Sequence, residues 1–380
     1  MKITGVKSFP ITANGRNFHF VKVETDEGIY GVGESGINSA GLAVHEATNH
    51  LGKLIAGEDP LATERMWQIM FRAGFFPGDR IMCSAISAID IALWDIKGKA
   101  LNLPVYRLLG GPVRDKVVCY HHTGGAEDTT ESLVKSALRD KKDGWKYIRW
   151  HIASTEKGVF EPVESVRYAV EQMAAVRDAV GHETEICLDV HTRLDTTLVI
   201  QLCKQLEPFK PFFIEDPIRS ENPASYRTLA RHISLPIAAG EQWASKWQFR
   251  EVIEEETINY ARIDLCIVGG LTEAAKVAHW CETHYIDIVP HNPLGPVSTA
   301  ACTHLCLATS NFAVQELPVV PGTHVPDVFP VQMPFEHGYL LQPQKPGLGL
   351  EFNEDAAREY SYAPRFTPRQ VRRDGSFTNW

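Results

Sequence analysis

The spacing of apolar residues divides the chain into segments of different character. From Phe18 to Gly33, apolar and polar residues alternate on either side of a turn at Asp26 to Gly28, which predicts a β-hairpin. From about Ala40 to Leu109 the apolar residues recur at helical spacing, most regularly over residues 82–98. Strands followed by helices indicate an α+β unit, which we predict to span residues 1–115.

After residue 112, short apolar strands alternate with longer helical stretches, and each strand ends in a polar residue. From Asp189 onward, successive strand ends are 26, 26, 23, 27 and 25 residues apart, the length of one strand, one helix and two short loops. This spacing predicts an α/β fold with a (β/α)8-type barrel over residues 116–325. The polar residues at the predicted strand ends are Arg149, His151, Asp189, His191, Glu215, Glu241, Asp264, His291 and Glu316.

The last segment, residues 326–380, is rich in proline, glycine and charged residues and shows no further strand–helix repeat. We expect it to return over the first domain.

Composition excludes several classes of function. The chain is 44% hydrophobic and 22% charged, as in ordinary soluble proteins, and has no apolar run of the roughly 18 residues that a membrane span needs. A net charge of -9 argues against nucleic acid or an anionic membrane as the main partner. The first residues lack a secretory signal pattern, so we expect a cytoplasmic protein. The eight cysteines form no CxxC pair and are predicted to be buried hydrophobic residues.

Three carboxylates lie at the ends of consecutive predicted strands. Because parallel strands of a barrel end at one mouth, Asp189, Glu215 and Glu241 should form a ring there. Such a ring requires a compensating cation, and oxygen ligands without Cys or His favour Mg²⁺, with Mn²⁺ as the second candidate. The alternative is that each acid pairs with Lys or Arg, which is common for one acid and much less so for three on consecutive strands.

Two histidines flank the predicted metal site. His191 lies two residues beyond Asp189, on the same strand face, and His291 follows a strand next to the one that carries Asp264. A carboxylate can orient an imidazole and raise its basicity. We therefore predict that His291 removes the proton next to a substrate carboxylate, while His191 protonates a hydroxyl that leaves from the next carbon.

The chain carries several short motifs: AIDIALWD at residues 88–95 with KGK at 97–99, LDVH at 188–191, IEDP at 214–217, GEQ at 240–242 and PHNPLGP at 290–296. Together they resemble the enolase superfamily, mandelate racemase subgroup, over essentially the whole chain. The resemblance implies a modified (β/α)7β barrel under an α+β capping domain, with one Mg²⁺ per site.

Within this subgroup the chain resembles two kinds of acid-sugar dehydratase. Galactonate dehydratases are matched by the Asp-x-His strand, the His291 and Asp264 pair, and Glu316, which in that family hydrogen-bonds the substrate or transition state. Mannonate dehydratases and their starvation-sensing relatives are matched at residues 15–18, 120–122, 189–194, and 345–349 through Trp380. The predicted substrate-binding residues are Arg149, His151, Asn38 and His122.

Two departures from the family narrow the choice of reaction. Residues 154–159 form a short segment without the tyrosine that mannonate dehydratases carry, which argues against mannonate. Racemases carry a pair of lysines where this chain has Arg149 and His151. Because arginine is too basic to be the usual general base, this replacement argues against a racemase that uses two bases.

The leading hypothesis is a Mg²⁺-dependent dehydratase that converts an aldonate, galactonate-like, to a 2-keto-3-deoxy acid. The alternatives are an epimerase or cycloisomerase that uses the same enediolate chemistry, and a non-catalytic sensor. We expect cap loops near residues 15–20, 33–39 and 72–80 to close the mouth, and we expect a homo-oligomer.

Overall fold

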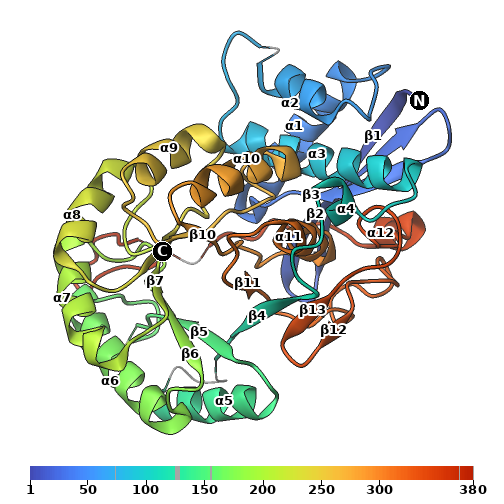
Figure 1. The fold of residues 1–380 in the computed structure, drawn as a ribbon. Helices are drawn as coiled ribbons and strands as arrows, with labels where there is room; N and C mark the ends of the chain where they lie inside the picture. The colour runs from blue at the N-terminus through green and yellow to red at the C-terminus, as the bar shows by residue number, and fades with distance from the viewer. Residues whose placement is uncertain (73, 125–128, 155, 368, 380) are drawn as a thin grey trace.

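The computed structural model describes residues 1–72, 74–124, 129–154, 156–367 and 369–379. Trp380, the end of the mannonate-dehydratase-like motif, lies outside these residues, as does one residue in each of the predicted loops at 72–80 and 154–159. A small sheet with its helices packs against a larger barrel ringed by helices (Figure 1).

The first part is the α+β cap. Its antiparallel sheet has the order β1-β2-β3 and contains the predicted hairpin as β2 and β3. Its strands are β1 (Ile3–Ala13), β2 (Arg16–Thr25) and β3 (Tyr30–Glu34). The helices that follow are η1 (Asn38–Ala40), α1 (Gly41–Leu54), α2 (Thr63–Arg72), α3 (Arg80–Ala100) and α4 (Val105–Leu108).

The second part is a parallel barrel. Its strands follow the order β4 to β10, β11 pairs with β4, and a bridge between Ile288 and Phe312 closes the ring. The strands are β4 (Lys116–His122), β5 (Tyr147–His151), β6 (Glu185–Asp189), β7 (Phe213–Glu215), β8 (Ile237–Ala239), β9 (Tyr260–Ala261), β10 (Asp287–Ile288) and β11 (Gln315–Glu316).

One α-helix lies between each pair of successive barrel strands. These are α5 (Thr130–Lys142), α6 (Pro162–Val180), α7 (Thr196–Leu206), α8 (Tyr226–His232), α9 (Lys246–Glu254), α10 (Gly270–Glu282) and α11 (Pro296–Ala308). Short 3-10 turns, η2 (Glu207–Phe209) and η3 (Pro223–Ser225), precede β7 and α8. The predicted (β/α)7β barrel is therefore confirmed for the described residues.

The barrel interior is filled by side chains at its closed end. Tyr120, Cys187, Phe213, Val289 and Val314 are fully buried and form one cluster there. All eight cysteines are buried and unpaired, as predicted. Within the described parts of the chain, no helix is long and apolar enough to span a membrane.

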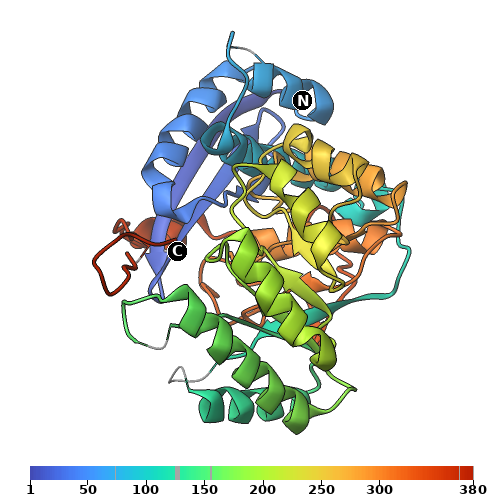
Figure 2. The ribbon, with the colours of Figure 1, turned by 90° about the vertical axis from the view of Figure 1, so that its left-hand side faces the viewer.

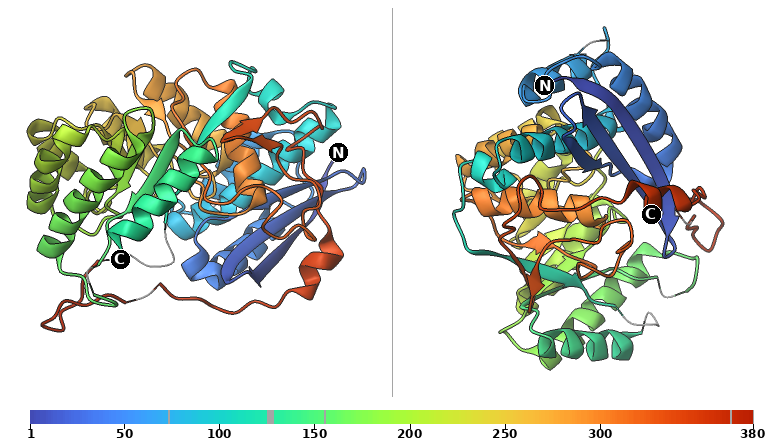
Figure 3. Two further views of the ribbon diagram at one scale, coloured as in Figure 1. Left: turned by 90° about the horizontal axis from the view of Figure 1, so that it is seen from below. Right: turned by 90° about the vertical axis from the view of Figure 1, so that its right-hand side faces the viewer.

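The C-terminal segment adds a feature that the sequence did not predict. Strands β12 (Phe335–Glu336) and β13 (Tyr339–Leu341) form an antiparallel hairpin, and β13 pairs antiparallel with β4. This hairpin is not part of the strand–helix repeat of the barrel. After α12 (Glu354–Glu359), the chain runs beside the cap sheet (Figure 2). It then crosses to the barrel, where Val371 bridges to Val159 (Figure 3).

A buried carboxylate joins the cap sheet to the barrel. Glu34, the last residue of β3, accepts hydrogen bonds from the backbone N–H groups of Gly295 (2.7 Å) and Ser298 (2.9 Å). Both N–H groups belong to the first turn of α11, where they have no acceptor within the helix and where the helix dipole favours an anion. Glu34 therefore fixes the end of β3 at the edge of the barrel mouth.

Two acids of α3 extend the same interface. Asp90 accepts from the backbone N–H of Thr272 at the start of α10, at 2.9 Å. Asp95 accepts from the N–H groups of Val32 (3.0 Å) and Leu348 (2.8 Å), so it connects the cap sheet to the returning C-terminal segment.

We predict that Asp95→Ala lowers the free energy of unfolding by about 1–3 kcal/mol, because two buried N–H donors lose their acceptor. The measurement is urea unfolding followed by circular dichroism. Asp178→Ala, an exposed acid on α6, is the control and should change stability little. Equal stability of the two variants would contradict this role of Asp95.

Candidate active site at the barrel mouth

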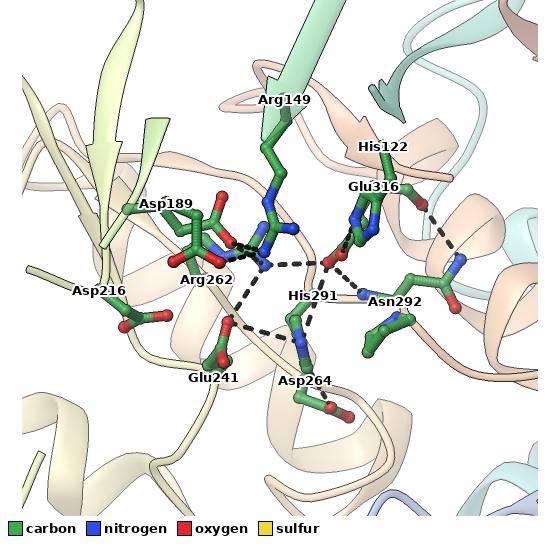
Figure 4. A network of polar contacts seen from close by, with 12 residues as sticks. His122, Arg149, Asp189, Asp216, Glu241, Arg262, Asp264, His291, Asn292 and Glu316 are labelled. Carbon is green, nitrogen blue, oxygen red and sulfur yellow. Dashed lines mark hydrogen bonds and ion pairs between the residues drawn. The ribbon is translucent and has the colours of Figure 1, made fainter. Parts of the chain in front are cut away.

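The three predicted ligand carboxylates converge at the mouth of the barrel, where Figure 4 shows Asp189 and Glu241 beside Arg262. Asp189 is the last residue of β6 and Glu215 the last of β7, and the two are direct partners in the parallel register. Glu241 follows β8 by two residues. Asp189 and Glu215 are fully buried and Glu241 is 9% exposed, so their charges need compensation within the protein.

Two buried arginines supply part of that compensation. Arg149 on β5 donates to Asp189 and, at 3.1 Å, to Glu215. Arg262, directly after β9, lies 2.9 Å from Oε1 of Glu215 and 3.2 Å from Oε2 of Glu241. Arg262 also donates to the phenol oxygen of Tyr120 inside the barrel.

The carboxylates still outnumber these cations. Ligand oxygens of Glu215, Asp216 and Glu241 lie within 4.8 Å of one another. Burial raises the pKa of Glu215 to about 7 despite the two arginines, and burial together with Glu241 raises the pKa of Asp216 well above its usual value. Among the described residues, Oε2 of Glu215 and Oδ2 of Asp216 are buried without a hydrogen-bond partner.

This donor set fits a hard divalent cation such as Mg²⁺, since it consists only of oxygens and includes unpartnered buried ones. Asp189 lies beside the cluster, and its oxygens accept from Arg149 and from the backbone N–H of His191 (2.6 Å). Asp216, which directly follows Glu215, was not among the predicted ligands.

His291 and Asp264 form a close pair. Nδ1 of His291 lies 2.7 Å from Oδ2 of Asp264, and Nε2 lies 3.5 Å from Oε2 of Glu241. The backbone N–H of Cys266 donates to the other oxygen of Asp264 and fixes its orientation. Burial alone would lower the pKa of His291, but the charges of Glu241, Glu316 and Asp264 raise it to about 9. The imidazole is thus a strong base with its Nε2 toward the carboxylates.

His191 lies beside the carboxylate cluster, and its backbone N–H donates to Asp189. It follows β6 in a left-handed conformation (φ 55°), which turns the chain at the strand end. Its imidazole is near Glu241: burial would raise the pKa of Glu241, and His291, Arg262 and His191 together lower it.

Glu316, at the end of β11, links the remaining polar groups. Its Oε1 lies 2.6 Å from Nε2 of His122, and its Oε2 accepts from Arg262 (2.9 Å) and the backbone N–H of Asn292 (2.8 Å). Burial and the nearby Arg149 lower the pKa of His122 to about 4, so this imidazole is neutral and donates to Glu316.

The other predicted substrate contacts lie at the rim. His151 ends β5 with an exposed side chain, opposite Asp189 in the register. Asn38 in η1 lines two cavities: one of about 330 Å³ with Glu241 and His291, and one of about 420 Å³ with His122. Asn38 therefore lies on the wall between the inner and the outer part of the mouth.

Arg262, Asp216 and Tyr120 belong to the site and were missed from the sequence. One signal was present: Arg262 lies two residues before Asp264, hence on the same face of a strand that ends at the mouth. A charged residue inside a short barrel strand needs buried partners, and the predicted carboxylates were the available ones.

Two family models cover most of the chain. Residues 7–110 match the mandelate racemase / muconate lactonizing enzyme N-terminal domain, and residues 132–356 match the enolase C-terminal domain-like family.

Named relatives align over the full length. The chain is 37% identical over 388 residues to a D-galactonate dehydratase of Ralstonia pickettii, with 100% of both chains covered. It is 37% identical over 367 residues to a D-galactonate dehydratase of Klebsiella pneumoniae, which covers 95% of this chain and 94% of the relative.

Solved structures agree with the fold. An enolase from Pantoea ananatis with bound D-gluconate and Mg superimposes with a TM-score of 0.91 at 30% identity, over 99% of both chains. A member of the enolase superfamily from Salmonella Typhimurium superimposes with a TM-score of 0.87 at 29% identity, over 95% of this chain and 98% of that one.

We predict that Glu241→Gln weakens Mg²⁺ binding by about tenfold or more, because an anionic oxygen ligand becomes a neutral amide. Titration calorimetry of the purified protein with MgCl₂ measures this directly. Glu183→Gln, an exposed change outside the mouth, should leave the affinity unchanged. Unchanged affinity in Glu241→Gln would remove this residue from the ligand set.

Proposed function

The chain belongs to the mandelate racemase and muconate lactonizing enzyme family of the enolase superfamily, and on this basis we propose that it is a Mg²⁺-dependent acid-sugar dehydratase. The proposed reaction is that of a hydro-lyase: an aldonate of the galactonate type loses water to give a 2-keto-3-deoxy acid. The observation that carries the proposal is the His291 and Asp264 pair, directed at a cluster of buried carboxylates, in a chain that aligns end to end with D-galactonate dehydratases.

Asp189, Glu215 and Glu241 would hold the Mg²⁺, with Asp216 next to them. When bound, the cation stabilises the negative charge that develops on the substrate carboxylate as the adjacent carbon loses its proton. Arg149 and Arg262 neutralise the remaining charge of this cluster and hold its carboxylates in place.

His291 takes the proton from the carbon next to the carboxylate. In the neutral imidazole that reacts, Nδ1–H donates to Asp264 and the Nε2 lone pair accepts that proton. The nearby carboxylates stabilise the imidazolium that results, as the raised pKa of His291 indicates.

His191 acts as the acid that protonates the leaving hydroxyl. The electron pair of the broken C–H bond forms the new double bond between C2 and C3, and the C3–O bond breaks. The hydroxyl leaves as water with a proton from His191, and the enol becomes the 2-keto acid. His122 and Asn38, which line the outer cavity, would contact the remaining hydroxyls, with Glu316 held by His122 and His151 at the end of β5 as further candidates.

The direct test is to incubate the protein and Mg²⁺ with every aldonate and aldarate stereoisomer and to detect 2-keto acids with semicarbazide. We expect one or a few stereoisomers to give keto acid at rates that fall on removal of Mg²⁺ with EDTA. Isomerised acid without keto acid would indicate an epimerase or cycloisomerase instead. No conversion of any acid by Mg²⁺-loaded protein would favour a sensor.

We predict that His291→Asn abolishes exchange of the C2 proton with solvent, since amide nitrogen cannot accept a proton at neutral pH. The measurement is NMR of the substrate in ²H₂O, with Mg²⁺ affinity measured in parallel to show an intact site. His232→Asn, an exposed change on α8, is the control. Retained exchange in His291→Asn would exclude this residue as the base.

A further inference from the structure

The outer cavity of the mouth carries positive charge. It measures about 420 Å³, and its lining includes Arg16, Arg365, His122 and Asn38 but no acidic side chain of the described residues. This is unusual for a chain of net charge -9 whose inner mouth is crowded with carboxylates. A cavity lined in this way favours an anionic ligand.

Arg365 reaches the cavity because the C-terminal tail is fixed to the cap. The backbone N–H of Thr12 donates to the carbonyl of Ser361 at 3.0 Å, and the N–H of Ala363 donates to the hydroxyl of Thr12 at 2.9 Å. These bonds align residues 361–363 with the end of β1 and place Arg365 beside the β1–β2 turn.

Gly15 in that turn leaves room for the guanidinium group. Its φ is 72°, a conformation that favours glycine, and a Cβ atom there would lie 3.1 Å from Nη1 of Arg365. Arg16, the next residue, donates to the carbonyl of Pro293 at 3.3 Å, two residues beyond His291. The two guanidinium groups therefore come from opposite ends of the chain to the same cavity.

Neither guanidinium group is paired with an acid in the part of the chain that the structure describes. Among the described residues, Arg16 and Arg365 form no ion pair with a carboxylate, whereas Arg149 and Arg262 form several. Arginine is the side chain best suited to recognise carboxylate or phosphate.

We propose that Arg16 and Arg365 form a distal anion subsite, which selects sugar acids that carry a second anionic group at the end away from the reacting carbon. Gly36, Asn38 and Ser39 line both cavities, so a linear sugar acid with its reacting end at Glu241 and His291 extends past them toward the arginines. The subsite thus refines the proposed substrate: of two acids of equal length, the aldarate should be a better substrate than the aldonate. This inference rests on the proposed function, because the reaction fixes which end lies at His291.

The test compares substrates that differ only at C6: galactonate with galactarate, and gluconate with glucarate and 6-phosphogluconate. For wild-type protein we expect a higher kcat/KM on the diacid than on the monoacid of the productive series. The 6-phosphogluconate arm shows whether the subsite accepts phosphate as well as carboxylate. Arg365→Met should lower kcat/KM for the diacid by about 10- to 100-fold and change the monoacid value much less.

Two further variants control the assignment. Arg365→Lys keeps the charge and should restore part of the preference for the diacid. Arg231→Met removes an exposed arginine on α8 that lines neither cavity, and it should leave the ratio unchanged. An equal loss on both substrates in Arg365→Met, or wild-type protein that prefers the monoacid, would overturn the proposal.

Calorimetry separates this inference from the proposed function. If no acid is dehydrated, the proposed function fails, yet titration of Mg²⁺-loaded protein with galactarate and glucarate still tests the subsite. We then expect wild-type protein to bind at least one diacid and Arg365→Met to bind it about 10-fold or more weakly. No binding by wild-type protein, or equal affinity of both proteins, would contradict the subsite.

Discussion

The site depends on the balance of buried charge at the barrel mouth. Four buried carboxylates, Asp189, Glu215, Glu241 and Glu316, surround the guanidinium groups of Arg149 and Arg262. Buried charges are stable only when they are paired and hydrogen-bonded, so each acid constrains the positions of the arginines and of its neighbours. The negative charge that the arginines leave over is what a divalent cation can neutralise, and the same excess makes His291 basic.

A second set of buried acids positions the cap loop that lies over the barrel mouth. Glu34 and Asp90 accept hydrogen bonds from backbone N–H groups across the boundary between cap and barrel, and Glu34 holds the end of β3 against α11. The loop that carries Gly36 and Asn38 starts directly after β3. Its position over the mouth is therefore set by hydrogen bonds to helix termini.

The sequence predicted the barrel and the meeting of its strand ends because both follow from a local repeat. Asp189 and Glu215 had to be neighbours once their strands were adjacent and parallel. Arg262 was missed because its role depends on partners from four other segments of the chain, which cannot be identified from the residues around it. The β13 pairing with β4 and the contact of Val371 with Val159 join residues far apart in sequence, and no periodicity encodes them.

The path of residues 361–367 assigns the proposed recognition and the proposed chemistry to separate parts of the chain. The groups proposed to react lie at the ends of barrel strands, where a change disturbs many buried partners. The tail reaches the outer cavity through a few surface hydrogen bonds. Substitutions there can change which molecule fits without altering proton transfer. When relatives with this barrel are sorted by the compounds they consume, similarity in the C-terminal tail should therefore count for more than identity averaged over the whole chain.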